Sequence, residues 1–226
     1  MYFGAWYALR FLSKALSTLL TIMNTQFLCA AVVAASLLLA GCNKAPGTAG
    51  ADTAAKAASQ PVSIAAITAG AKGFTVGAPM SAHTVYVFFD AQCPHCAELW
   101  DAAKPLVPLA KFVWIPVGLL NPASTEQGAA LLAAKDPATA MDAHEASMRA
   151  HQGGITASGD MDAQRAEVKK NTDLMTRFGF GSIPTIVGTN AQTGALVTQE
   201  GASGTAALAT LLGLQIPAAA LPASAN

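Results

Sequence analysis

A short strand-forming run that leads directly into two closely spaced cysteines constrains this fold more than any other feature. Residues 84–89 are apolar on both alternating faces, as expected for a central strand covered on both sides. The motif Cys93-Pro94-His95-Cys96 follows almost at once. Because proline is tolerated in the first turn of a helix, the motif predicts a helix that begins at Pro94. The two cysteines are therefore expected at a strand-to-helix junction.

Strands and helices alternate around this junction. Alternating or continuous apolar residues indicate strands, whereas apolar residues three or four positions apart indicate helices. The predicted strands are 74–76, 84–89, 112–117, 184–187 and 196–198. The predicted helices are 61–70, 94–109, 124–134, 137–150, 160–178 and 205–212. Pro105 is expected to kink or end the second helix, and the pattern as a whole predicts an α/β fold.

Composition limits both the size of the fold and its partners. The 226 residues are enough for one domain with its own core. The formal net charge is zero and only 12% of the residues are charged, so the chain offers no basic face to phosphate groups. We therefore expect no nucleic-acid partner.

The four cysteines divide into two groups. Cys29 and Cys42 lie within or at the end of an apolar N-terminal segment, which leaves Cys93 and Cys96 for the folded domain. A bridge between residues this close together encloses almost no chain and adds little stability. The spacing instead suits redox chemistry or a metal ion.

Redox chemistry fits the position of this pair. At the start of a helix, Cys93 faces unpaired backbone N–H groups and the positive end of the helix dipole, which favour the thiolate. His95 can donate to the Cys93 sulfur or place positive charge near it. Cys96 lies one turn further on and is expected to be less exposed, which suits a resolving thiol. A stable reduced form makes the disulfide a better oxidant.

A zinc or copper site is the alternative for these cysteines, because two cysteines at this spacing beside a histidine are metal-ligand types. The sequence has no second pair of cysteines or histidines at ligand spacing to complete four ligands. We therefore expect no metal. His83, His144 and His151 each stand alone in a polar context and are expected at the solvated surface.

The N-terminus has the residue order of a bacterial export signal. Arg10 and Lys14 precede an apolar stretch at 15–40, which polar residues interrupt at 24–26. Residues 39–42 look like a bacterial lipobox, in which the cysteine receives a diacylglycerol and the preceding peptide is removed. This predicts a lipoprotein signal peptide at 1–41 and a lipid anchor at Cys42. The alternative is an uncleaved membrane helix over 15–40, and the true start is either Met1 or Met23.

The two ends of the mature chain are expected to be unstructured. Residues 43–60 carry no large apolar side chain, so 42–60 is expected to be a lipidated, flexible tether. Residues 217–226 are mostly alanine and proline and are expected to form a disordered tail. The folded domain is thus predicted at 61–216.

The order strand, helix, strand, long helical segment, hairpin and helix resembles a thioredoxin-like fold with a helical subdomain inserted at about 120–179. Residues 86–212 resemble the DsbC/DsbG family of periplasmic thiol-disulfide interchange proteins, and DsbG most closely. The residues that carry the resemblance are Val87-Phe88-Phe89-Asp90, Cys93-Pro94-His95-Cys96, Trp100, Ala103-Lys104-Pro105, Val117-Gly118, Pro122, Ala134-Lys135-Asp136-Pro137-Ala138, Glu145-Ala146-Ser147 and 171–179.

This resemblance implies a nucleophile at Cys93, a resolving cysteine at Cys96 and no cofactor beyond their redox-active disulfide. It also implies that Pro184 is a cis-proline that faces the disulfide, with Ile183 and Thr185 beside it to bind an extended substrate. The implied chemistry is reduction or isomerisation of disulfides or sulfenic acids in exported proteins that contain cysteines.

Three features depart from the family pattern. The dipeptide Pro94-His95 is typical of the oxidase DsbA, and Ile183 replaces the threonine that the family carries before its cis-proline. The segment between Cys42 and the first core strand is too short for the family's N-terminal dimerisation domain, so we expect a monomer. In addition, Val87 occupies the position where thioredoxin and DsbA place a buried acid. Asp90 and Glu98 are nearby substitutes, although a solvated residue or a helix-start charge is the simpler expectation for either.

These observations favour a lipid-tethered periplasmic oxidoreductase that reduces disulfides or sulfenic acids and is kept reduced by a membrane donor resembling DsbD. The outer membrane is favoured because Asn43, and not an aspartate, follows Cys42. One alternative is a DsbA-like oxidase, re-oxidised by a partner resembling DsbB. The other is a metal-carrying lipoprotein.

Overall fold

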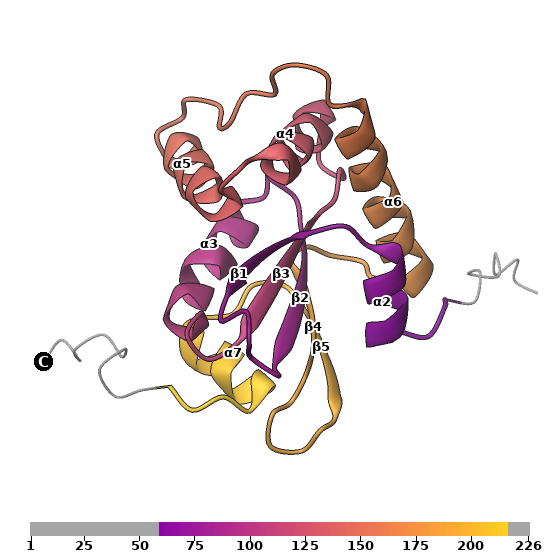
Figure 1. Cartoon of the computed structure of the whole chain (residues 1–226), viewed down its shortest axis with the longest axis vertical. Helices are drawn as coiled ribbons and strands as arrows, with labels where there is room; N and C mark the ends of the chain where they lie inside the picture. Colours follow the sequence, from indigo (N-terminus) through magenta and orange to yellow (C-terminus); the bar gives the residue numbers. More distant parts are fainter. Residues whose placement is uncertain (1–58, 217–226) are drawn as a thin grey trace, which may run out of the picture. The chain divides into compact units, whose positions relative to one another are not determined.

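The computed structural model describes residues 59–216, which form the elements drawn in Figure 1. The predicted signal peptide, the lipidation site at Cys42, most of the predicted tether and the predicted tail lie outside the described residues. Within 59–216, no helix is long and apolar enough to cross a membrane.

Within residues 59–216, five strands and six α-helices follow one another in the predicted order. The strands are β1 (Phe74–Gly77), β2 (Thr84–Phe89), β3 (Lys111–Pro116), β4 (Thr185–Thr189) and β5 (Leu196–Glu200). The helices are α2 (Ile64–Gly70), α3 (Pro94–Ala103), α4 (Pro122–Ala133), α5 (Pro137–Arg149), α6 (Asp162–Phe178) and α7 (Thr205–Leu212), with a 3₁₀ turn, η2 (Lys104–Leu106), after α3.

The strands form one mixed sheet in the order β1-β3-β2-β4-β5. β2 pairs in parallel with β3 and antiparallel with β4, so that Val87 lies between Trp114 and Ile186. The prediction that residues 84–89 form a central strand is confirmed. Because β2 and β3 are parallel, both end at the same edge of the sheet, and the cysteine motif begins at that edge.

Helices cover both faces of the sheet, which explains why β2 is apolar throughout. Val85, Val87 and Phe89 belong to a core cluster completed by residues of α3 and α7. Tyr86 and Phe88 point the other way, into a cluster with residues of α2 and α6. Figure 1 shows these two helix pairs on opposite sides of the strands. The alternation of a strand's side chains thus places β2 inside two cores at once.

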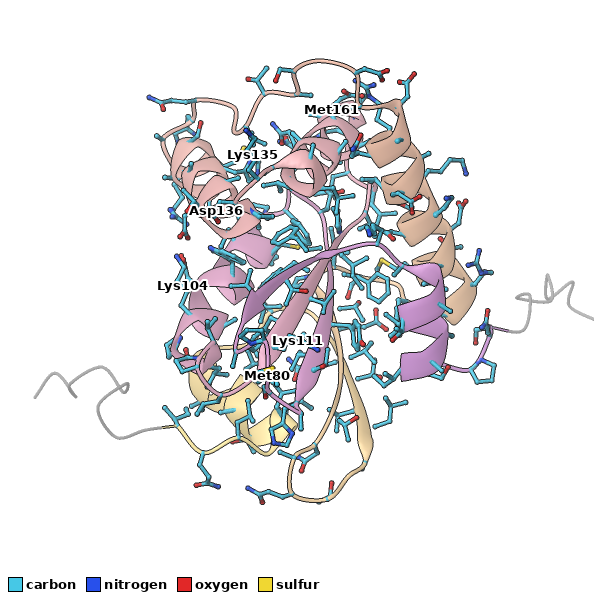
Figure 2. All side chains as sticks on the ribbon, viewed as in Figure 1. Met80, Lys104, Lys111, Lys135, Asp136 and Met161 are labelled. Carbon is cyan, nitrogen blue, oxygen red and sulfur yellow. The ribbon has the colours of Figure 1, made fainter. Side chains whose placement is uncertain are left out.

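Helices α4 to α6 form the long helical segment between β3 and β4. Asn121 caps α4 in a capping box with Ser124, and Pro122 occupies the first helical turn. This cap starts α4 two residues before its predicted start at 124, because proline at the first position fits a helix already capped by asparagine. Met161, labelled in Figure 2, precedes α6 and packs with alanines of α4.

Helix α3 ends earlier than predicted. Its regular part stops at Ala103, and Lys104–Leu106 continue as the 3₁₀ turn η2. Pro105 has no N–H group to donate to a carbonyl four residues back, which ends the α-helical ladder. The predicted effect of Pro105 is therefore confirmed, whereas the predicted helix end at 109 is wrong.

Candidate active site

Cys93 is the N-cap residue of α3, and Pro94 opens the helix. The Cys93 backbone is extended, with φ −94° and ψ 115°, and its carbonyl accepts hydrogen bonds from the Cys96 and Ala97 N–H groups at 3.0 and 3.3 Å. The sequence folds this way because β2 delivers the chain to the sheet edge and proline favours the first helical turn. Cys93 consequently occupies the helix N-terminus, where a thiolate is stabilised.

The two thiols differ sharply in their ionisation. Both are free, with Cys93 7% exposed and Cys96 fully buried. A hydrogen bond with Cys96 is the main reason that the pKa of Cys93 is lowered to about 6, against the opposing effect of burial. Burial, followed by the same hydrogen bond, raises the pKa of Cys96. At neutral pH, Cys93 is therefore the thiolate and Cys96 the thiol that donates to it.

His95 points toward Glu98 and not toward the cysteine sulfur. Its Nδ1 lies 2.9 Å from the Glu98 carboxylate, and the two side chains are 70% and 64% exposed. The hydrogen bond with Glu98 raises the pKa of His95. Among the causes that lower the pKa of Cys93, the charge of His95 is the smallest. The imidazole thus acts on the thiolate from a distance, while Glu98 occupies the solvated position expected for it.

The predicted proline loop lies against Cys93. The Ile183–Pro184 peptide bond is cis, and the Ile183 carbonyl oxygen is 3.9 Å from the Cys93 sulfur. The Thr185 side chain is fully buried and donates to the Ser182 carbonyl at 2.6 Å. The Ile183 carbonyl therefore faces Cys93 directly, whereas Thr185 is held inside the sheet.

The expectation that Asp90 is a solvated residue or a helix-start charge is wrong, since it is buried and lies before the first turn of α3. Asp90 is fully buried at the end of β2. Its carboxylate accepts the Gln92 N–H at 2.9 Å and the Leu119 and Leu120 N–H groups at 2.7 and 3.0 Å. Since a buried carboxylate requires such donors, Asp90 joins the cysteine loop to the loop that follows β3.

The expectation of a solvated His144 is wrong as well. His144 is 1% exposed, and it bonds through Nε2 to the Ala91 carbonyl at 2.7 Å. Its Nδ1 accepts the Ile155 N–H at 3.0 Å, so the Nε2 atom carries the proton and donates. Burial lowers the pKa of His144. This neutral imidazole ties α5 to the residue two positions before Cys93.

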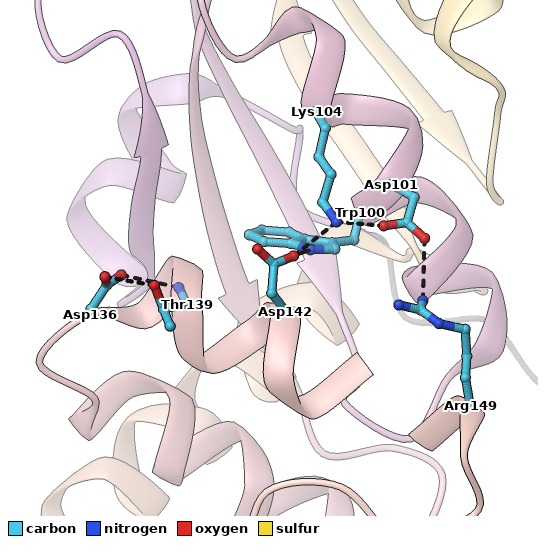
Figure 3. A network of polar contacts seen from close by, with 7 residues as sticks. All are labelled: Trp100, Asp101, Lys104, Asp136, Thr139, Asp142 and Arg149. Atoms are coloured by element: carbon cyan, nitrogen blue, oxygen red, sulfur yellow. Dashed lines mark hydrogen bonds and ion pairs between the residues drawn. The ribbon is translucent and has the colours of Figure 1, made fainter. Parts of the chain in front are cut away.

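A polar network fixes α5 against α3, as Figure 3 shows. The Trp100 indole N–H donates to Asp142 at 2.8 Å. The Lys104 ammonium lies 2.9 Å from Asp142 and 2.7 Å from Asp101, and Arg149 lies 3.2 Å from Asp101. Because this network joins two helices distant in sequence, the helical segment forms one wall of the site.

The described domain contains no cluster of metal-ligating side chains. Between residues 59 and 216, no three His, Cys, Asp or Glu side chains lie close enough together to hold a metal ion. Cys42, the predicted lipidation site, lies outside this range.

Two buried residues near Cys93 had no predicted role in the site, namely His144 and Glu145. These two residues are adjacent in an alanine-rich helix, and nothing in the local sequence indicates that their side chains are buried.

Comparison with known proteins identifies relatives of this domain, although no family model matches the chain. The thiol:disulfide interchange protein DsbG of Pseudomonas aeruginosa is 36% identical over 131 residues, or 57% of this chain and 50% of that protein. DsbG of Escherichia coli is 34% identical over 104 residues, or 45% of this chain and 42% of that protein. Over these residues the chain is DsbG-like. It spans about half the length of the curated relatives it matches.

Solved structures establish the fold as thioredoxin-like. Proteus mirabilis ScsC in a compact conformation gives a TM-score of 0.54 at 17% identity, covering 70% of this chain and 81% of that one. A periplasmic thioredoxin-like protein from Salmonella enterica gives 0.54 at 16% identity, covering 68% and 97%. Pseudomonas aeruginosa DsbA2 gives 0.51 at 22% identity, covering 62% and 95%. The predicted fold class is confirmed.

Proposed function

We propose that this DsbG-like chain is an exported thiol-disulfide oxidoreductase that reduces or exchanges disulfides or sulfenic acids of proteins through Cys93 and Cys96. The observation that carries the proposal is the asymmetry of the two thiols. Cys93 is an ionised nucleophile at a helix N-terminus, and Cys96 is a buried thiol that donates a hydrogen bond to it. Attack followed by resolution requires this difference.

Reduction of a substrate disulfide proceeds in two exchanges. The Cys93 thiolate attacks one sulfur of the substrate disulfide, forms a mixed disulfide with it and expels the other sulfur as a thiolate. Loss of the charge on Cys93 removes one cause of the raised Cys96 pKa, and Cys96 gives up its proton. Cys96 then attacks Cys93 and expels the second substrate thiolate. The substrate gains two electrons, its two thiolates take up one proton from Cys96 and one from the solvent, and the chain is left with a Cys93–Cys96 disulfide.

Sulfenic acids follow the same course. Attack of Cys93 on the sulfur of a substrate sulfenic acid forms the mixed disulfide and releases water after protonation of the hydroxide. Cys96 resolves the mixed disulfide as before. In either case, a membrane-bound dithiol protein resembling DsbD must return two electrons to the Cys93–Cys96 disulfide. Without that donor the chain would stop after one turnover.

The backbone beside Pro184 supplies the place where an extended substrate lies. The Ile183 carbonyl is within 3.9 Å of the reacting sulfur, so a substrate strand bonded there presents its cysteine to Cys93. The Ile183 side chain is partly buried against both cores. Thr185 contributes by holding this loop, since its hydroxyl bonds to the Ser182 carbonyl.

Oxidation of substrates is the second candidate direction, and one observation favours it. A Cys93 pKa of about 6 stabilises the reduced form and so makes the disulfide more oxidising. In that case the chain would accept electrons from substrate thiols and pass them to a partner resembling DsbB. The resting redox state of the pair in cells separates the two directions.

The proposed location is the periplasm, with attachment to a membrane through a lipid on Cys42. A monomer is sufficient for reduction, because the reaction needs one exposed edge of Cys93 and one proline loop. We propose this state in preference to the dimer expected of an isomerase. Sedimentation of the full chain in detergent tests the oligomeric state, and metabolic labelling with a palmitate analogue tests the anchor.

Two assays test the proposed activity. The full chain in detergent should catalyse insulin reduction by dithiothreitol, and Cys93→Ser should abolish catalysis. Acid trapping and alkylation in cells should find the pair mostly reduced. A mostly oxidised pair would support the oxidase direction, whereas activity that survives Cys93→Ser would contradict both.

A further inference from the structure

A cavity opens beside Cys93 between the first turns of α3 and the end of α5. Its volume is about 510 Å³, which is within the range of small-ligand sites. Cys93 lines it together with Pro94 and Ala97 of α3, and Glu145, Met148 and Arg149 line it from α5. A group bound in this cavity can therefore lie beside Cys93.

Glu145 is the unexplained group in this cavity. The residue is only 3% exposed. Among residues 59–216, no side chain gives its carboxyl a hydrogen bond or lies within ion-pair distance, whereas the buried Asp90 has three backbone donors. Burial raises the pKa of Glu145 to about 7, and the nearby charges of Asp101 and Cys93 raise it too, while Arg149 opposes them. The Glu145 carboxyl oxygens are not enclosed by protein atoms, so a ligand in the cavity can supply the donor that this nearly buried carboxyl needs.

We propose that this cavity binds a basic side chain, lysine or arginine, that flanks the reacting cysteine of a protein substrate, and that Glu145 pairs with it. This inference rests on the proposed function, because it assigns a specificity site to the same reaction. Glu145 acts in recognition and takes no part in the sulfur exchange.

The lining of the cavity matches the two parts of a basic side chain. Ala91, Pro94, Ala97 and Met148 offer apolar contact to its methylene groups, as such stems require. Its charged end meets Glu145, because the other two carboxylates that line the cavity already have partners within the chain: Glu98 lies 2.9 Å from His95 and Asp101 lies 2.7 Å from Lys104. Arg149 is the opposing cation, and it is already paired with Asp101 at 3.2 Å. A substrate cation is thus the donor that Glu145 lacks.

Synthetic peptides test this site directly. Each peptide carries one cysteine in a mixed disulfide with thionitrobenzoate, and lysine, norleucine or glutamate stands at one flanking position at a time. Release of thionitrobenzoate by the reduced full chain gives the rate of attack by Cys93, after subtraction of the rate with Cys93→Ser. At the best flanking position, lysine should react about tenfold faster than norleucine, the lower end expected of a hydrogen bond to a charged group, and glutamate should be slowest.

The variant Glu145→Gln should bring the lysine and norleucine rates together, and the ratio is the decisive readout because a change in Cys93 reactivity alters both rates equally. Asp160→Asn, which removes an exposed carboxylate outside the cavity, should keep the wild-type ratio. Equal rates for lysine and norleucine in the wild-type chain, or a preference that survives Glu145→Gln, would overturn the inference. A wild-type chain that reacts with none of the peptides would contradict the proposed function itself.

Discussion

The hydrogen bond from Cys96 to the Cys93 thiolate can be removed or kept by two closely matched variants. Cys96→Ala removes the donor, whereas Cys96→Ser keeps a hydroxyl that can donate. A hydrogen bond to a charged group is worth about 1.5–3 kcal/mol, and one pKa unit corresponds to about 1.4 kcal/mol, so Cys96→Ala should raise the pKa of Cys93 by about 1 to 2. Cys96→Ser should leave it closer to the wild-type value of about 6.

The pH dependence of alkylation measures this difference. The rate of iodoacetamide labelling follows the thiolate fraction, and mass spectrometry of the peptide that contains Cys93 excludes the other cysteines. With a pKa of about 6, roughly nine-tenths of Cys93 is ionised at pH 7 in the wild-type chain. Equal midpoints for Cys96→Ala and Cys96→Ser would refute the hydrogen bond as the main cause.

Three further variants test the environment of the pair. Asp90→Asn should lower the free energy of unfolding by about 2–3 kcal/mol in urea titrations, since the buried charged acceptor of three backbone N–H groups is lost; Glu98→Gln, on the surface, is the control. Burial lowers the pKa of His144, so below about pH 6.5 this imidazole binds a proton in the unfolded chain but not in the folded chain. Stability should therefore fall between pH 7 and pH 5, and less so in His144→Gln; equal slopes would contradict this. His95→Tyr should raise the pKa of Cys93 less than Cys96→Ala does, measured by the same alkylation profile.

Local pattern predicts the scaffold of this domain closely. The central position of β2 follows from its two apolar faces, and α4 to α6 follow from apolar periodicity and caps. Gly179 ends α6 with φ 76°, a left-handed conformation that glycine adopts readily. The start of α3 at Cys93 and Pro94 can also be predicted locally, because it depends on adjacent residues.

The polar interior of the site depends instead on partners distant in the sequence. Asp90 is buried because Leu119 and Leu120 bring N–H groups to it, and His144 because Ala91 and Ile155 do so. Single polar residues are ordinarily exposed, so nothing in their own neighbourhood signals burial.

The proline loop at Ile183 and Pro184 depends on both local and distant residues. Pro184 could be assigned from its place before a strand together with the cysteine motif ninety positions earlier. The direction of the Thr185 side chain could not, because it depends on the pairing of β4 with both β2 and β5. Sequence patterns therefore predict which residues are near Cys93 better than which side chains reach it.

Trapping of the mixed disulfide tests the central claim most directly. If Cys93 attacks and Cys96 resolves, the full-length Cys96→Ala chain expressed in a Gram-negative bacterium should accumulate disulfide-linked complexes with exported proteins. Diagonal gels with and without reductant would display these complexes, and mass spectrometry would locate the bond at Cys93. The Cys93→Ala chain should form none. Complexes of equal yield in Cys93→Ala, or none in Cys96→Ala, would contradict the account.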